Sequence, residues 1–292
     1  ILLTTLLGTI MGIARLSTNL LVSKISATYV EIIRNMPLLV QIVFWQIVFL
    51  QLPQISNALT PGGISILSNR GAFLPWVHAN PGTNTWLLIS LLGLIAATVL
   101  RWYLKRTEEI TGKSKYPNVA SGLLFLGICF GSFILMGLPL DQNIPSVVRN
   151  EFGTYKESGG FAITPEFTAL LIALVLYTGT FISEIVRGSI QSLQKGQTEA
   201  AKALGLSNYQ RTTLIILPQA LRSIIPPLTN QYLNLTKNSS LAVVIAYPDL
   251  FMVSRTIMNN SGNSLQMFVL ILATYLFLSL FISAGMNLLN RR

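Results

Sequence analysis

The sequence is poor in charge: only 10% of its 292 residues are Asp, Glu, Lys or Arg, whereas a soluble domain carries about 25%. A chain with so few charges cannot cover a surface that faces water on every side, which excludes an ordinary soluble globule. Hydrophobic residues make up 51% and gather in long runs, at 37–53, 86–100, 119–140, 167–182 and 265–289. Helical runs of about 17 to 25 residues match the hydrocarbon thickness of a bilayer. The chain is therefore predicted to be embedded in a membrane.

Cysteine and histidine are nearly absent. Cys129 is the only cysteine, so an internal disulfide and a cysteine metal site are excluded, and the single His78 excludes a histidine cluster for metal chemistry. The sequence also lacks G-x-x-x-x-G-K-[ST], the phosphate-binding loop of many ATPases. We therefore expect no metal, no cofactor and no ATP hydrolysis in this chain. It begins with Ile1 inside an apolar stretch too short to span a bilayer, and we interpret the N-terminus as truncated.

The net charge of +10 does not indicate nucleic-acid binding, because aromatic residues are not interleaved with the basic ones as a base-stacking platform requires. If the segment 14–36 is cytoplasmic, fifteen Lys and Arg fall on the cytoplasmic side and four on the other, while Lys237 stays within an apolar region. This bias predicts the orientation. The connections 54–85 and 141–164 are then extracytoplasmic.

Both of these connections are rich in residues that favour loops. Segment 54–85 abounds in Pro, Gly, Asn and Ser, and segment 141–164 mixes charges with glycine and proline. We expect irregular connections, too short for a separate domain, and thus one all-α, multispanning membrane domain over residues 1–292. The pairs Gly8/Gly12 and Gly127/Gly131 have the GxxxG spacing that allows helices to approach closely, although simple packing is the better explanation in a chain with 21 glycines.

The segment 188–218 carries the signals of a short helix between two apolar runs. Residues 197–204 are rich in good helix formers, and Gly205 stands where a helix end favours a left-handed residue. Ser207 and Gln210 have the spacing of a capping box that starts another helix. The first helix would be about 12 Å long. Its shape suits docking into a partner protein.

This segment also contains a long motif, E-A-A-x3-G-x9-I-x-L-P, which is matched by Glu199, Ala200, Ala201, Gly205, Ile215, Leu217 and Pro218. It resembles the cytoplasmic loop signature of permeases in ATP-binding-cassette (ABC) importers. Seven fixed positions would coincide by chance about once in ten million trials at ordinary residue frequencies. An ordinary amphipathic loop helix is the weaker interpretation.

Further stretches resemble the polar amino-acid uptake subfamily of these permeases: YVEIIRNMPLLVQIVFWQ from Tyr29, EIVRGSI from Glu184 and PPLTNQYLNLTKNSSL from Pro226. The R-N-x-P-L-L-x-Q-I-x-F-W motif is most similar to the general L-amino-acid branch, and so is the additional apolar pair 86–104 and 119–140. The motifs bracket residues 29–250. The resemblance implies a type I ABC importer permease fold with two extra helices inserted before the core.

The resemblance also implies partners. A bacterial inner-membrane permease of this kind pairs with a second permease subunit, here expected to be a related but different chain, and with a dimer of ATP-binding subunits in which ATP and Mg²⁺ act. An extracytoplasmic binding protein delivers the amino acid, and broad L-amino-acid specificity is expected. Closure of the ATP-binding dimer would be transmitted through Glu199, Ala200, Ala201 and Gly205. Small residues there let the helix seat closely, and Gly205 permits the turn out of the joint.

Polar residues in or near the spans form a second candidate site, because intramembrane charge is costly and often functional. Glu184 and Arg187 are three apart on one helix and are expected to pair. Arg34 precedes the next span, and Lys237 follows a helix that we expect to be broken by Pro226 and Pro227. These groups either contact substrate or gate its path, or they are structural ion pairs that snorkel to the headgroups.

Asparagines at a spacing of four residues, Asn230, Asn234 and Asn238, are predicted to form a polar stripe. The stripe faces the substrate pathway or joins helices to one another. Two rival functions remain open at this stage. An ion-gradient-driven carrier also uses broken helices but needs no docking helix, and an intramembrane enzyme needs converging catalytic groups that the sequence does not offer.

Overall fold

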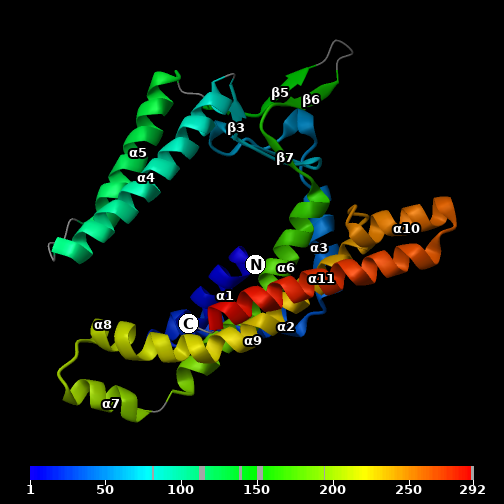
Figure 1. Ribbon diagram of the computed structural model, residues 1–292. Coiled ribbons are helices and arrows are strands. Elements are labelled where there is room, and N and C mark those ends of the chain that lie inside the picture. The colour runs from blue at the N-terminus through cyan, green and yellow to red at the C-terminus, as the bar shows by residue number, and fades with distance from the viewer. Residues whose placement is uncertain (81, 112–115, 138–139, 150–153, 194, 291–292) are drawn as a thin grey trace. The chain divides into compact units, whose positions relative to one another are not determined.

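The computed structural model describes residues 1–80, 82–111, 116–137, 140–149, 154–193 and 195–290 (Figure 1). Contacts divide the chain into two compact units. We call residues 1–52, 69–71 and 163–292 the core unit, and residues 53–68 and 72–162 the inserted unit. Each unit is mainly helical, as the composition predicts.

The core unit is built from helices in the order α1 (Leu2–Ala14), α2 (Leu20–Asn35), α3 (Leu38–Leu50), α6 (Pro165–Gln191), α7 (Lys195–Ala203), α8 (Asn208–Arg211), α9 (Leu217–Asn238), α10 (Leu250–Ser261) and α11 (Ser264–Asn290). A π-helical turn, Thr212–Ile216, joins α8 to α9, and a 3₁₀ turn, Ser239–Ile245, follows α9. The helix α6 lies at the centre of this unit. It contacts α1, α2, α3 and α9.

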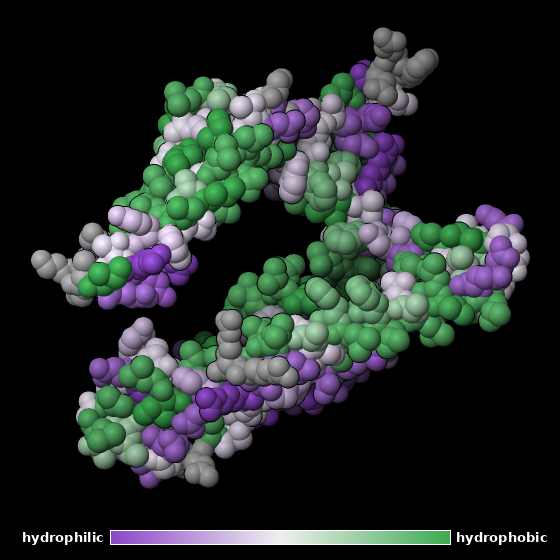
Figure 2. Space-filling view, in the orientation of Figure 1, coloured by the Kyte–Doolittle hydropathy of each residue, from purple (hydrophilic) through white to green (hydrophobic). Residues whose placement is uncertain are grey.

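Two apolar clusters surround α6. Towards its N-terminal half, Leu170 and Leu174 pack with Ile42 of α3 and with residues near the end of α9. Towards its C-terminal half, Ile182 and Val186 pack with α9. Over half of the apolar stretch of α6 is buried (56%), against 11% for α4 and α5 and 6% for α11. Helices as apolar as α4, α5 and α11 that bury so little must meet lipid or partner helices, and Figure 2 shows hydrophobic colour along them.

The glycine pair of α1 permits its close approach to α6. A methyl group at Gly8 would lie 2.5 Å from Cβ of Ile182, and one at Gly12 would lie 2.8 Å from the carbonyl oxygen of Ser183. The close-packing prediction is therefore confirmed for this pair. At Gly127 and Gly131 an added methyl group would meet nothing within 4 Å in the inserted unit, so that unit by itself shows no close helix approach there.

A sharp bend separates α2 from α3. Met36 is extended (φ −92°, ψ 132°) because the following Pro37 disfavours the helical conformation there. The side chain of Gln41, which is 2% exposed, donates hydrogen bonds to the carbonyl oxygens of Ile33 (2.9 Å) and Met36 (3.1 Å). These bonds tie α3 to the end of α2, where the last carbonyl groups of a helix lack their usual helical donors. The two helices meet at 103°.

The expectation of a helix broken at Pro226 and Pro227 is wrong. Helix α9 runs from Leu217 to Asn238 through both prolines, as membrane helices often do. The interruption comes later, at the 3₁₀ turn 239–245, which ends at Ala246 in the left-handed conformation (φ 57°). Lys237 therefore lies in the last turn of an intact helix.

The inserted unit contains a long helical hairpin, α4 (Thr83–Thr111) and α5 (Pro117–Leu135), so the two extra helices are confirmed. Gly93 of α4 allows the close approach of these helices, since a methyl group there would lie 2.8 Å from Ile128. Before and after the hairpin come two 3₁₀ turns, Ile55–Asn57 and Pro61–Gly63, and seven short strands: β1 (Ile66–Ser68), β2 (Gly71–Leu74), β3 (Trp76–Ala79), β4 (Leu140–Asn143), β5 (Ser146–Arg149), β6 (Tyr155–Ser158) and β7 (Phe161–Ile163).

The expectation that 54–85 and 141–164 are irregular is therefore wrong. The two connections pair with each other: β3 runs antiparallel to β4, with Trp76 opposite Asn143, and β7 joins β1 and β2 in a three-stranded sheet. Ile55, Ile66 and Phe73 form a small core beneath them. Strands of three or four residues are too short for a readable alternation, and their partners lie far away in the sequence.

Four helices among the described residues, α4, α5, α6 and α11, are long and apolar enough to cross a membrane. Two bent pairs raise the number to six if each pair forms one span. These are α2 with α3, and the stretch Tyr209–Ile245 with α10. The prediction of a multispanning all-α chain agrees with this count.

Candidate functional site

The short helix predicted at 197–204 is present as α7, Lys195–Ala203. It ends in a Schellman motif: the backbone N–H of Gly205 donates to the carbonyl oxygen of Lys202 (2.9 Å), and that of Leu206 donates to Ala201 (3.1 Å). Gly205 adopts φ +72°, which costs a residue with a side chain about 1–2 kcal/mol. The predicted left-handed exit is confirmed.

The predicted capping box is also present. The backbone N–H of Ser207 donates to Oε1 of Gln210 (2.9 Å), and the backbone N–H of Gln210 donates to Oγ of Ser207 (3.2 Å). This starts α8, which passes through the π-helical turn into α9. Figure 1 shows α7 and α8 as a short helical hairpin at the beginning of α9. The side chain of Gln219 on α9 donates to Gln197 on α7 (3.3 Å) and so links the hairpin to the long helix.

The motif residues of the loop divide by exposure. Glu199, Ala200 and Gly205 lie on the open surface of the chain, whereas Ala201 is only 1% exposed. Two large apolar side chains stand out beside them, Leu204 and Tyr209, each 78% exposed. These two side chains place apolar area on the surface of a polar loop. The buried Ala201 instead holds α7 against the rest of the loop.

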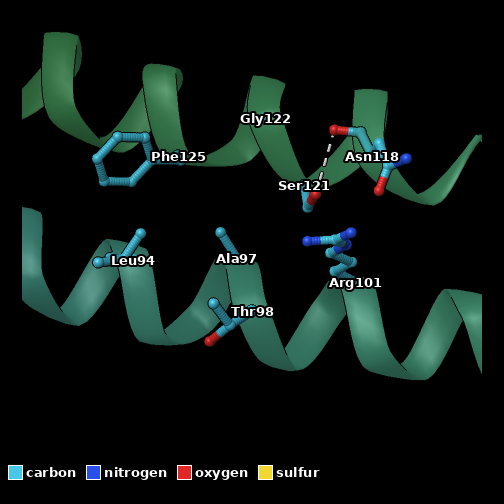
Figure 3. A pocket seen from close by; sticks show the side chains of 8 residues that line it. All are labelled: Leu94, Ala97, Thr98, Arg101, Asn118, Ser121, Gly122 and Phe125. Atoms are coloured by element: carbon cyan, nitrogen blue, oxygen red, sulfur yellow. Dashed lines mark hydrogen bonds between the residues drawn. The ribbon is translucent and has the colours of Figure 1, made fainter. Parts of the chain in front are cut away.

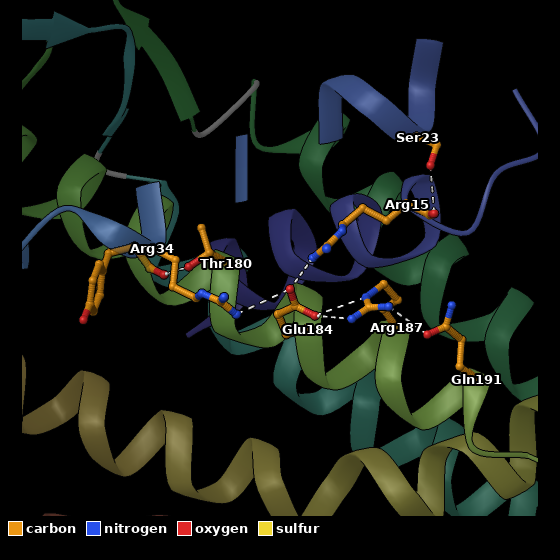
Figure 4. A network of polar contacts seen from close by, with 8 residues as sticks. Arg15, Ser23, Arg34, Thr180, Glu184, Arg187 and Gln191 are labelled. Carbon is orange, nitrogen blue, oxygen red and sulfur yellow. Dashed lines mark hydrogen bonds and ion pairs between the residues drawn. The ribbon is translucent and has the colours of Figure 1, made fainter. Parts of the chain in front are cut away.

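The second candidate site is a cluster of charges around Glu184 of α6 (Figure 4). Arg187, one turn along the same helix, donates from Nε (3.1 Å) and Nη2 (2.9 Å) to Oε2 of Glu184, which confirms the predicted pair. Arg15 at the end of α1 donates to the other carboxylate oxygen, Oε1. Arg34 in the last turn of α2 reaches the same Oε1 at 3.5 Å. One carboxylate thus ties together three helices.

The arginines of this cluster are not equivalent. The side chain of Arg15 is 13% exposed, that of Arg187 is 32% exposed and that of Arg34 is 40% exposed. Arg187 also donates to Oε1 of its neighbour Gln191 (2.8 Å). Arg34 makes the longest contact with Glu184 and is the most open of the three to a further anion. The cluster has more positive than negative charge, so it can accept one.

Sequence reasoning found Glu184, Arg187 and Arg34 but missed Arg15, which it counted only as a cytoplasmic charge. Arg15 lies 169 positions from Glu184 in the sequence, and no local pattern connects them. The signal available was weak: Arg15 is the first charge after the apolar stretch of α1. A cation at a helix C-terminus is also favoured by the helix dipole.

The other predicted pathway residues, Lys237 and Asn230, lie on α9 and are not among the partners of Glu184. The buried face of α9 carries Ile224, Leu228 and Tyr232. The opposite face carries Asn230, Asn234 and Lys237, all exposed, so the stripe exists but Asn238 is only partly exposed. A polar helix face in a membrane unit needs water or polar partners, since lipid leaves it unsatisfied.

Comparison with known proteins identifies the family. Residues 117–292 match the family described as "Binding-protein-dependent transport system inner membrane component". A crystal structure of an amino acid ABC transporter with histidines is similar over 100% of this chain and 87% of that chain, with a TM-score of 0.53 and 19% identity. This likeness concerns the fold, and the predicted permease fold is confirmed.

Two curated relatives are similar over nearly the whole chain. The general L-amino acid transport system permease protein AapQ of Rhizobium johnstonii is 40% identical over 99% of this chain and 71% of its own length. The glutamate/glutamine/aspartate/asparagine transport system permease protein BztB of Rhodobacter capsulatus is 37% identical over 96% of this chain and 72% of its own. The chain therefore belongs to the binding-protein-dependent transport system inner membrane components, and it is a multi-pass inner-membrane permease subunit of such a system.

Proposed function

We propose that this permease imports amino acids with energy from ATP that is hydrolysed, with Mg²⁺, in a partner subunit, and that residues 188–218 receive the partner. The observation that carries the proposal is α7: a short helix with a Schellman end and a following capping box, bearing the complete loop signature of the family. The substrate class follows from the relatives, whose names specify general L-amino acids or acidic amino acids and their amides. Broad L-amino-acid specificity is the version that we favour.

The ATP-binding subunit would seat on the exposed face of the loop. Glu199 supplies a charge, Ala200 is small enough for close contact, and Leu204 and Tyr209 supply apolar area. Gly205 turns the chain away from the contact with the ATP-binding subunit. Ala201 has a different task in this proposal, because it is buried in the loop itself: it fixes the angle of α7, so a movement imposed on α7 passes to α9 through the Gln197–Gln219 bond.

The substrate would pass along polar surface of the core unit. The exposed face of α9 with Asn230, Asn234 and Lys237 offers amide groups and one cation for a zwitterion. Arg34 is the second candidate, since its guanidinium is the least committed to Glu184. Glu184, Arg187 and Arg15 satisfy one another, which supports a structural role for these three. The α9 face would complete the path against a second permease subunit, a related but different chain.

Orientation belongs to the same proposal. The basic residues place 188–218 in the cytoplasm and the connections 54–85 and 141–164 outside, where an amino-acid-binding protein would dock. The two units would then act together as one permease domain over residues 1–292, with β1–β7 in its extracytoplasmic connections.

Single cysteines test both parts of the proposal. In intact cells, Ser158→Cys on the exposed strand β6 should react with an impermeant maleimide, and Ala200→Cys should not. In membranes that contain the assembled transporter, Ala200→Cys should cross-link to the ATP-binding subunit, whereas Ser158→Cys serves as the control that should not. Reaction of Ala200→Cys from outside, or cross-linking that is equal at both positions, would refute the docking assignment.

A further inference from the structure

A groove runs between α4 and α5 of the inserted unit, well away in sequence from the loop and the charge cluster (Figure 3). Its volume is about 370 Å³, within the usual range for small-molecule sites. One end is apolar and is lined by Leu94, Ala97 and Phe125. The other end is polar, and Figure 3 shows Arg101 of α4 facing Ser121 and Asn118 of α5 there. The groove is therefore amphipathic along its length.

Small residues create this space. Ala97 lines α4 and Gly122 lines α5, where larger side chains would fill the gap. A methyl group added at Gly122 would meet nothing within 4 Å. Within the inserted unit the hollow is thus not closed, and a side chain could be built into it without a clash.

The polar end presents a cation with room for an anion. No carboxylate of the described residues lies within ion-pair distance of the Arg101 guanidinium. The hydroxyl of Ser121 donates to the carbonyl oxygen of Asn118 (3.2 Å), and both residues line the same end of the groove. Lys105 follows one turn beyond Arg101, and both line a second hollow towards the tip of the hairpin together with Glu108, Glu109 and Asn118.

Arg101 is expected to lie at the depth of the lipid headgroups in the bilayer. Helix α4 has 29 residues and is about 43 Å long, which exceeds the hydrocarbon thickness of about 30 Å. The apolar run 86–100 ends directly before Arg101. With that run in the hydrocarbon, the guanidinium lies at its edge, and the apolar part of the groove extends into the bilayer.

We propose that this groove binds an anionic glycerophospholipid, with the phosphate at Arg101 and one acyl chain between Leu94 and Phe125. The occupant follows from charge and polarity together: a cation at headgroup depth meets the phosphate, and an apolar trough below it meets the chain. Basic pockets between transmembrane helices bind anionic lipid headgroups in this way. The inserted hairpin would thus hold a structural lipid.

The test measures lipid retained by the purified transporter complex. The complex is exchanged into nanodiscs of phosphatidylglycerol and phosphatidylcholine in equal amounts, re-extracted in mild detergent, and its bound lipids are quantified by mass spectrometry. Gly122→Leu fills the groove, and Arg101→Gln removes the cation. Each has a matched control outside the groove: Gly127→Leu on α5, where an added side chain also meets nothing within 4 Å, and Arg106→Gln, whose guanidinium lies over the Trp102 ring.

We expect phosphatidylglycerol to be retained over phosphatidylcholine in the unaltered protein. Retention should fall about fivefold in Arg101→Gln, the factor expected when one basic contact near the headgroups is lost. It should also fall in Gly122→Leu, because the added side chain fills the groove. Both controls should retain lipid as the unaltered protein does. No preference for the anionic lipid, or equal retention in all four variants, would overturn the proposal. A complex that falls apart in Gly122→Leu while Arg101→Gln keeps its lipid would also overturn it, because a partner helix would then fill the groove.

Discussion

The loop 188–218 and the charge cluster around Glu184 belong to the same unit but differ in the sequence separation of the residues that build them. In the loop, the cap at Gly205 and the Ser207–Gln210 box join residues at most five positions apart, and the Gln197–Gln219 bond spans 22 positions. In the cluster, Glu184 meets Arg15 and Arg34, which are 169 and 150 positions away. The loop is therefore built mainly from contacts between near neighbours in the sequence. The cluster exists only when three helices have packed, and it holds them in place.

This contrast predicts the largest effect at Glu184. The change Glu184→Gln removes the charge that accepts from three arginines, so those guanidiniums lose their partner in a partly buried site. We expect a loss of about 2–3 kcal/mol in the stability of the core unit, measured as a lower melting temperature of the purified transporter. Glu31→Gln on the exposed surface of α2 is the control. Equal melting temperatures for both variants would show that the charge cluster stabilises the core unit no more than an exposed surface charge does.

The close contact between α1 and α6 near the cluster should give the next largest effect on stability. In Gly8→Ala the added methyl group would collide with Ile182 of α6, and overpacking of this kind costs about 1–3 kcal/mol. In Gly127→Ala the methyl group enters open space, so stability should be unchanged or gain about 0.5–1 kcal/mol from the better helix former. Thermal unfolding of the two purified variants measures the difference. A destabilised Gly127→Ala would show that α5 is covered on this side by another helix.

The loop should respond in function more than in stability. Gly205→Val forces a β-branched residue into a left-handed conformation at a cost of about 1–2 kcal/mol. Membrane insertion should stay unchanged, because no span is altered, while ATP-driven uptake should fall. Gly205→Asn, which tolerates this conformation better, should retain more uptake. Normal uptake in Gly205→Val would contradict the coupling role of this turn.

The smallest effect is expected on the polar face of α9. Lys237→Met removes an exposed cation without disturbing the cluster, so folding should be normal. If Lys237 faces the substrate, uptake of acidic amino acids should weaken relative to basic ones. Competition between labelled glutamate and unlabelled arginine measures this preference. An unchanged preference would assign Lys237 to the headgroup region instead.

The sequence anticipates what is local. Three predicted features depend only on neighbours within five positions, and all are present: the cap at Gly205, the Ser207–Gln210 capping box and the Glu184–Arg187 pair. Contacts between distant segments were not predictable from one sequence: Arg15 beside Glu184, and the pairing of β3 with β4 across the hairpin. The break predicted at the prolines of α9 was wrong for another reason. A membrane helix can accommodate Pro226 and Pro227, so proline alone does not locate its end.

The most direct test of the central claim, that an ATP-binding partner drives this permease through residues 188–218, is uptake in proteoliposomes. The chain is reconstituted with its second permease subunit, the ATP-binding subunit and the amino-acid-binding protein, and labelled amino-acid uptake is measured with and without ATP and with ionophores that collapse ion gradients. We predict uptake that requires ATP and the binding protein, withstands the ionophores and is lost in Gly205→Val. Uptake that proceeds without ATP and stops when the ion gradient collapses would contradict the account and identify an ion-driven carrier.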